Sequence, residues 1–460
     1  MRPLATALRC CPILLAVALA RPLRAQSSST APPPENQPWP TAVCTEAFAD
    51  NKQSGYLASV LELLDRDREA RHGDADVRSL YLDVLGTQLA LVNEEARANA
   101  AGDEAFAANY KLSKAPDKDP FADLHQQDAL ATLLKLVEGR RVLMLNEEHG
   151  SSVQRAFANV LLDPLKKAGF SYLAVEAIDE DGAALKARGY PVLATGTGTR
   201  DPALGDLIRR ALATGWVVVP YEASAEDRAR RPTDKSFFDA NNRREAGQAR
   251  NILERALNAD PSARVLVLAG QDQIAEEATG EWMPMGAVLK QLAATDPLSV
   301  NETLMTEHSR PELEHWAFKR AFDKGWLDTD PIVLLNAAGT PWSAVPGAAD
   351  VSLFHPRTYL DHGRPQWMAM GKLRRPVELT LEPQSEPTLL QAHVAGESPD
   401  AVPLDQCIVW PDKPAPALML RVGKYELTQI DAEGKQLHRE DYEVKDIKLP
   451  EKKKWPPAPK

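Results

Sequence analysis

The chain has 460 residues, 44% of them hydrophobic, and a formal net charge of −11, with 54 Lys and Arg against 65 Asp and Glu. This length exceeds one ordinary hydrophobic core and indicates two or three domains, and the apolar fraction is typical of a globular protein. A chain this acidic is a poor nucleic-acid binder because its field repels phosphates, so we expect no nucleic-acid partner.

The first 25 residues have the pattern of a secretory signal peptide. Arginines precede an apolar run from Cys11 to Ala20, and the small residues Ala20 and Ala25 offer cleavage points. The run is too short to span a bilayer, and no later stretch is apolar enough to cross one. Cleavage removes four arginines and no acid, which changes the formal charge from −11 to −15. We therefore expect a periplasmic or secreted protein without a membrane span.

Residues 26–44 follow as a Ser/Pro-rich linker, and residues 45–126 are predicted to be a helical lead-in. Leu57, Val60, Leu61 and Leu64 recur at helical spacing, which predicts an apolar helix face that must cover another part of the fold. We find no candidate site residue in this lead-in.

Residues 127–350 alternate short apolar runs with amphipathic stretches and are predicted to form one α/β domain. The runs predict five strands buried on both faces, at Arg141–Leu145, Tyr172–Val175, Trp216–Val219, Arg264–Leu268 and Pro331–Leu335. Helices are predicted between them, at Ser152–Ala168, Pro202–Ala213, Asn241–Leu257, Met285–Ala293 and Pro311–Lys324. This alternation predicts a parallel sheet flanked by helices with right-handed crossovers.

Residues 376–450 contain alternating runs such as 377–381, 417–422 and 425–430, which predict a small antiparallel β module. Residues 451–460 are predicted to be a disordered tail. After signal cleavage two cysteines remain, Cys44 and Cys407. In an oxidising compartment they could form a disulfide between the N-terminal and C-terminal regions, and the alternative is two unpaired thiols.

The residues after each predicted strand are the candidate site residues, because ligands of an open α/β sheet bind at the carboxyl ends of its strands. If the strands are parallel and adjacent, one crevice receives Asn146, Glu147, Glu148, His149, Glu176, Tyr221, Glu222, Gly270, Gln271, Asp272, Gln273 and Asn336. Carboxylates gathered at this density suit acid/base chemistry or a cation.

His149 is the candidate base, because imidazole exchanges protons near neutral pH. Considered alone, His149 fits better as a helix-capping or core histidine at a strand–helix junction, but Glu147 two residues before it and Glu176 at the next strand end favour a functional role. Glu148 alternates with Glu147 along the strand and is expected to point elsewhere. Glu222 and Asp272 are either site carboxylates or ion-pair partners of nearby arginines.

Four segments, taken together, resemble a known superfamily. Asn146-Glu-Glu-His-Gly150 resembles the Gly-Glu-x-His signature of the superfamily that contains erythromycin esterases, TIKI proteases and ChaN-like haem-uptake proteins. Leu173–Glu176 resembles its second glutamate segment, residues 244–252 its arginine helix, and residues 265–289 its Gly-x-x-His and Met-Gly-x-x-Leu segments. The similarity covers about residues 128–340.

The resemblance implies a water-activating site made of Glu147, His149, Glu176 and Arg244, with Arg244 stabilising an oxyanion. Two departures are visible: Asn146 replaces a glycine, and Gln273 stands where the family has a second histidine. We place Glu222, Gln271, Asp272 and Gln273 as substrate-contacting or secondary residues.

These observations predict an exported hydrolase that cleaves an ester or amide. The alternative is a periplasmic protein that only binds haem, a metal or another small ligand in the same crevice, or a scaffold with a vestigial crevice. The expected partner is a small molecule or a peptide. No cofactor is required by the predicted chemistry, although a divalent metal or haem would fit the superfamily, and the sequence does not set the oligomeric state.

Overall fold

The computed structural model describes residues 55–71, 75–106, 113–176 and 178–445. The predicted signal peptide, the linker with Cys44, and the C-terminal tail lie outside these residues. Cys407 is described; it is buried in a strand of the C-terminal part and forms no disulfide with another described residue, so its pairing with Cys44 remains a prediction. No helix among the described residues is long and apolar enough to cross a membrane.

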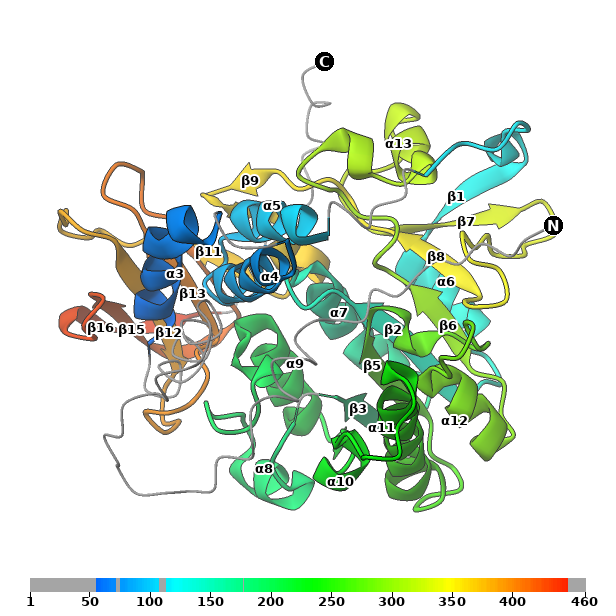
Figure 1. Ribbon diagram of the computed structural model, residues 1–460. Helices are drawn as coiled ribbons and strands as arrows, with labels where there is room; N and C mark the ends of the chain where they lie inside the picture. Colours follow the sequence, from blue (N-terminus) through cyan, green and yellow to red (C-terminus); the bar gives the residue numbers. More distant parts are fainter. Residues whose placement is uncertain (1–54, 72–74, 107–112, 177, 446–460) are drawn as a thin grey trace.

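A mostly parallel sheet forms the centre of the molecule (Figure 1). Its strands, in the order in which they lie side by side, are β1 (Leu124–Asp128), β7 (Ile332–Asn336), β8 (Val351–Phe354), β6 (Leu298–Asn301), β2 (Val142–Glu147), β5 (Val265–Gly270), β3 (Tyr172–Val175) and β4 (Val217–Pro220). From β8 to β4 every neighbouring pair is parallel. The predicted fold class, an α/β sheet with an N-terminal helical segment and a C-terminal antiparallel module, is confirmed.

The strand predicted at Pro331–Leu335 has a different direction from the one expected. It is β7, which pairs antiparallel with both β1 and β8. Its carboxyl end, at Asn336, therefore lies at the opposite edge of the sheet, and Asn336 is not a site residue. The crevice edge is formed instead by β8, β6, β2, β5, β3 and β4, of which β6 and β8 were not predicted.

Helices cover both faces of the sheet because its strands are apolar on both sides. They are α6 (Ala129–Leu136), α7 (Val153–Lys167), α8 (Gly182–Arg188), α9 (Pro202–Ala213), α11 (Phe237–Ile252), α12 (Met285–Ala293) and α13 (Trp316–Asp323). The short helix α10 (Ala225–Arg228) packs against α11 and has no buried residue. One core gathers α6, α7, α8 and α9 against residues such as Leu143 and Leu173. The other gathers α11 and α12 against the alternate residues, such as Met144 and Ala174.

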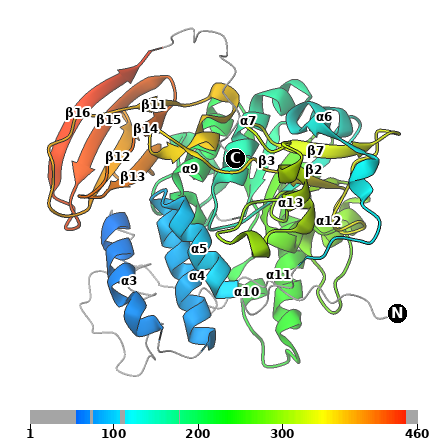
Figure 2. The ribbon, with the colours of Figure 1, turned by 90° about the horizontal axis from the view of Figure 1, so that it is seen from above.

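Three N-terminal helices lie between this domain and the C-terminal β module (Figures 1 and 2). They are α3 (Tyr56–Ala70), α4 (Ala75–Leu91) and α5 (Glu95–Phe106). Their apolar side chains share one core with Leu389 and Ile408 of the module. On the other side, Asp103 of α5 accepts hydrogen bonds from the backbone and hydroxyl of Ser309 in the loop after β6, both at 2.6 Å. The helical segment therefore joins the two β-containing parts.

The C-terminal module consists of short antiparallel pairs and one four-stranded sheet. Its strands are β9 (Leu360–Asp361), β10 (Arg364–Pro365), β11 (Arg375–Val377), β12 (Thr388–Val394), β13 (Asp405–Val409), β14 (Leu418–Leu420), β15 (Gly423–Ile430) and β16 (Gln436–Val444). The four-stranded sheet has the order β13-β12-β15-β16. Buried Arg364 donates to both carboxylate oxygens of Asp405, at 2.9 and 2.8 Å, and so ties β10 to β13.

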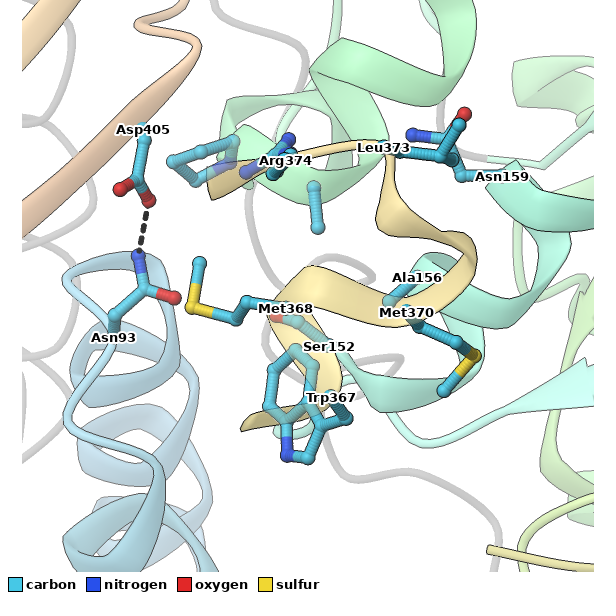
Figure 3. A pocket seen from close by; sticks show the side chains of 12 residues that line it. Asn93, Ser152, Ala156, Asn159, Trp367, Met368, Met370, Leu373, Arg374 and Asp405 are labelled. Carbon is cyan, nitrogen blue, oxygen red and sulfur yellow. Dashed lines mark hydrogen bonds between the residues drawn. The ribbon is translucent and has the colours of Figure 1, made fainter. Parts of the chain in front are cut away.

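A small cavity marks the junction of the three parts (Figure 3). Asn93 reaches it from the helical segment, Ser152 and Asn159 from the start of α7, and Arg374 and Asp405 from the C-terminal part. Its volume of about 20 Å³ suits a single water molecule and no larger ligand. The junction is therefore a packed structural interface.

Candidate functional site

Four adjacent strands deliver the predicted site residues to one edge of the sheet. Glu147 is the last residue of β2 and lies opposite Gly270 of β5. Glu176 and Glu222 follow the ends of β3 and β4, which are neighbours of each other, and β3 also pairs with β5. Because the strands are parallel, all of their carboxyl ends open into the same crevice.

His149 stands at the centre of this edge and is held by Glu147. Its Nδ1 lies 3.6 Å from Oε1 of Glu147, and 32% of the imidazole is exposed, whereas the Glu147 side chain is 8% exposed. Burial lowers the pKa of His149, but the hydrogen bond and charge of Glu147 and the charge of Glu176 outweigh it and raise that pKa above its ordinary 6.5. The other ring nitrogen, Nε2, faces the end of β5 at Gly270.

Arg155, near the start of α7, holds the carboxylate of Glu147 in one orientation. Its Nε and Nη2 donate to the two carboxylate oxygens of Glu147 at 2.9 and 2.8 Å, and its Nη1 forms an ion pair with Asp201. The Arg155 side chain is 3% exposed. Burial raises the pKa of Glu147, but the guanidinium charge and the hydrogen bonds of Arg155 and His149 lower it to about 2. Glu147 is therefore an ionised carboxylate of fixed orientation.

A second ionic group lies beside the first, on α11. Arg244 donates through Nε to Oε1 of Glu222 at 3.1 Å and through Nη2 to Oε2 of Glu222 and to Glu176. Gln248, one turn later, donates to Glu176 at 3.1 Å and to Glu222 at 3.2 Å. The pKa of Glu176 is raised by burial and lowered by Arg244 and His149, with a net decrease. The predicted residues Glu147, His149, Glu176 and Arg244 thus lie together.

The secondary residues have separate positions. Gln273 accepts from the backbone N–H of Gly270 at 3.0 Å and donates to Gln248 at 2.9 Å, so it supports the ionic group of α11. Gln271 donates to Glu148 at 3.2 Å, away from His149. Asp272 is half-buried in the short helix η5 (Gln271–Ile274). Glu222 is a site carboxylate paired with Arg244, whereas Arg243 pairs with Asp234 at 2.6 Å.

Comparisons with known proteins leave the family open. No family model and no curated protein matches this chain. Among solved structures, the chain is similar to one described as bacterial protein toxins, with 16% identity, 55% of this chain and 56% of that chain covered, and a TM-score of 0.31. A second such crystal structure gives 16% identity, 49% and 45% coverage and a TM-score of 0.30.

A third similar structure is that of RRSP, a MARTX toxin effector domain from Vibrio vulnificus CMCP6, with 15% identity, 50% of each chain covered and a TM-score of 0.27. The chain spans about half the length of these three structures. Similarity this distant carries no argument about activity. The resemblance to the erythromycin esterase superfamily therefore stays a prediction from the motifs.

A buried pair that the sequence analysis missed continues the edge beyond β2. Glu302 follows β6 and His355 follows β8, and Nε2 of His355 lies 3.0 Å from Oε2 of Glu302. Burial and the charge of Glu147 raise the pKa of Glu302 well above its ordinary value, while burial lowers the pKa of His355 to about 3. Burial therefore opposes the charged form of each group.

Two acids of the N-terminal helices also interact electrostatically with groups of this region. Burial raises the pKa of Asp83 on α4 to about 7, and the charge of His149 opposes that increase. Burial also raises the pKa of Glu95 on α5 to about 8, with Asp201 adding to it. Both carboxyls therefore lie near the crevice edge, and their long-range position could not be found from local spacing.

The described residues contain no cluster of metal-ligating side chains that would support metal binding. No group of three or more His, Cys, Asp or Glu side chains in the described part of the chain is arranged to hold a metal ion. Three carboxylates of the edge, Glu147, Glu176 and Glu222, are instead engaged by Arg155 and Arg244. A metal or haem remains a prediction from the resemblance.

Gly270 provides the space that His149 occupies, which gives a first prediction. A Cβ on Gly270 would lie 3.0 Å from Oε1 of Gln273 and 3.2 Å from Nε2 of His149. Gly270→Ala is therefore expected to displace the imidazole and to cost about 1–3 kcal/mol of unfolding free energy. Urea unfolding and the NMR signals of the His149 ring measure both effects. Gly150→Ala is the control, because a Cβ there meets nothing within 4 Å; equal behaviour of the two variants would contradict the prediction.

Proposed function

We propose that the chain is a hydrolase in which His149 activates water to cleave an ester or amide. The observation that carries the proposal is the orientation of His149: a buried, ionised Glu147 faces Nδ1 at 3.6 Å, and Nε2 lies at the carboxyl end of β5, beside Gly270. A carboxylate on one ring nitrogen holds the imidazole in the tautomer whose other nitrogen accepts a proton. A structural histidine would need neither this orientation nor the partial exposure of the ring.

The other residues have assignable roles in this proposal. His149 Nε2 takes a proton from water as the oxygen attacks the carbonyl carbon, and returns it to the departing alkoxide or amine. Nη1 of Arg244 donates to no described residue, whereas Nε and Nη2 are used by Glu222 and Glu176, so Nη1 is the donor available to the developing oxyanion. Glu176 and Glu222 hold the guanidinium in place, and Glu176 also favours the protonated imidazole.

The location is part of the same proposal. It depends on the predicted signal peptide at residues 1–25 and on the acidic mature chain. Fractionation of cells that produce the full chain, with N-terminal sequencing of the product, tests it.

Activity is tested with two panels of chromogenic substrates, nitrophenyl esters and aminoacyl nitroanilides. The proposal expects turnover of at least one class by the wild-type chain, and loss of that turnover when His149 is replaced. Wild-type turnover that persists unchanged without His149, or no turnover across both panels, would contradict it.

The pH dependence of the reaction gives a second prediction. The base form of His149 is its neutral form, and its raised pKa means that this form is populated only above pH 6.5. The acid limb of kcat/KM is therefore expected above pH 6.5. In Glu147→Gln the pKa of His149 falls, because the carboxylate that raises it is gone, so the limb moves to lower pH while the maximal rate falls. Profiles between pH 5 and 9 measure this, with the exposed Glu226→Gln as control; an unmoved limb in Glu147→Gln would refute it.

A further inference from the structure

A large cavity opens beside the His149 edge, between the three parts of the molecule. Its volume is about 700 Å³, within the range of sites that hold a ligand of drug size or a short peptide. One wall is formed by the helical segment, through residues 93–94 and α5. The α/β domain contributes the loop after β2, the first residues of α7, residues 306–308 after β6 and residues 355–360 after β8. The C-terminal module contributes residues 410–416 after β13. Glu148, the neighbour of His149, belongs to the wall.

The cavity wall is acidic. Five carboxylates line it and only two cationic side chains do: Glu94, Glu95, Asp103, Glu148 and Glu307 against Arg97 and Lys413. Asp103 is paired with His308 at 2.6 Å, and Glu94 lies 3.8 Å from Arg97. Glu95, Glu148 and Glu307 have no ion pair with any residue that the structure describes. Burial raises the pKa values of Glu95 and Glu307, and a cationic ligand would pair with Glu148 and favour the ionised forms of these two acids.

Two deeply buried polar atoms of the cavity wall have no hydrogen-bond partner among the described residues. This observation is independent of the acidic charge of the wall. Gln154 is 1% exposed and His355 is 2% exposed, and both line the cavity. Oε1 of Gln154 and Nδ1 of His355 have no hydrogen-bond partner among the described residues. Buried polar groups are almost always hydrogen-bonded, so atoms of this kind at a cavity mark a ligand.

The two atoms are complementary to a peptide group. Nδ1 of His355 is a donor or an acceptor according to the tautomer of the ring, so it can pair with a carbonyl oxygen or an N–H of a ligand. Oε1 of Gln154 is an acceptor and suits an N–H. The aromatic rings of Trp367 and Trp410 on the wall suit the apolar stems and the charged ends of Lys and Arg.

We propose that this cavity binds a short extended peptide segment carrying Arg or Lys side chains. Backbone N–H and C=O groups of the peptide pair with Gln154 and His355, and the cationic side chains pair with Glu148 and the neighbouring carboxylates. This binding site goes beyond the proposed hydrolysis, because it uses no residue of the His149 and Arg244 groups and needs no turnover to be observed.

Equilibrium binding to the full chain tests the proposal without reference to activity. The probe is a fluorescently labelled, terminally blocked hexapeptide of alternating Gly and Arg, followed by anisotropy at low salt. The matched peptide with Glu in place of Arg tests the charge, and spermidine as competitor tests the peptide group, since it carries three positive charges and no amide. Glu148→Gln and Gln154→Leu are the site variants, and Glu226→Gln, an exposed acid on α10, is the charge-matched control.

The proposal expects the basic peptide to bind at least tenfold more tightly than the acidic one, and spermidine to compete poorly. Glu148→Gln and Gln154→Leu should each weaken binding about tenfold, and Glu226→Gln should leave it unchanged. Equal binding of the two peptides overturns the proposal, and so does an equal effect of Glu148→Gln and Glu226→Gln. Full competition by spermidine overturns the peptide assignment in favour of a simple polyamine site. Thermal unfolding of each variant establishes that it is folded.

Discussion

Replacing His149 with alanine is expected to lower kcat/KM for ester or amide hydrolysis by about 10²–10⁴-fold, the usual contribution of a positioned general base. The imidazole is one-third exposed and makes its closest ionic contact with Glu147, which Arg155 holds independently. The fold should therefore survive the substitution, and the loss should appear in kcat rather than in KM. Steady-state kinetics on the best substrate of the panels, with urea unfolding in parallel, measure both effects.

The control is His362→Ala. His362 is 42% exposed on the β9–β10 turn, pairs with Glu378 and makes no contact with the His149 or Arg244 groups among the interactions of the described residues. This variant should keep wild-type kinetics. If His149→Ala also kept them, His149 would be a structural residue and the hydrolase proposal would fail.

The strands that the sequence predicts well are those with continuous apolar runs. β2 and β5 are buried along their whole length, and β3 and β4 also consist of consecutive apolar residues, so the sequence predicts all four strands and the candidate site residues that follow them. β6 and β8 include Ser299 and Ser352, which interrupt the apolar pattern. With those strands unrecognised, Glu302 and His355 could not be placed at the edge.

The direction of a strand is the second feature that the sequence does not predict. The run at β7 is apolar like the others, and nothing in its side chains distinguishes an antiparallel neighbour from a parallel one. Its pairing is decided by β1 and β8, whose residues Leu124 and Phe354 lie far from one another in the sequence. Asn336 was therefore assigned to the wrong edge.

The sequence predicts those residues of the candidate site that local spacing or a strand end identifies. Glu147 and His149 are two residues apart, and Glu176 and Arg244 were found from strand ends and from the motif resemblance. Arg155 and Asp201 were missed because a charged residue on a helix is usually solvated, and only the fold shows that both are buried against Glu147. The acids of α4 and α5 depend on how the helical segment packs, which no local pattern encodes.

Arg155→Met is expected to lower the unfolding free energy at pH 7 by about 3–5 kcal/mol, the usual effect of removing one partner of a buried ionic group. Arg155 is 3% exposed and is bonded to Glu147 and Asp201, which are also buried. Methionine fills much of the same volume, so the loss comes from two carboxylates left without a cation. Urea unfolding measures it, with the half-exposed Arg66→Met as control, for which a change within about 0.5 kcal/mol is expected.

The pH dependence of that loss distinguishes charge from packing. In the wild-type chain the pKa of Glu147 is about 2, below its ordinary 4.5, so its contribution to stability is complete above pH 4.5 and disappears as the pH falls through about 2. Without Arg155 the buried carboxyl has a pKa above 4.5, and folding then takes up a proton as the pH falls. The deficit of Arg155→Met should therefore shrink between pH 7 and pH 4.5, and Glu147→Gln in the same chain should remove part of it at pH 7. A deficit that stays constant with pH would mean that Arg155 stabilises the fold through packing alone.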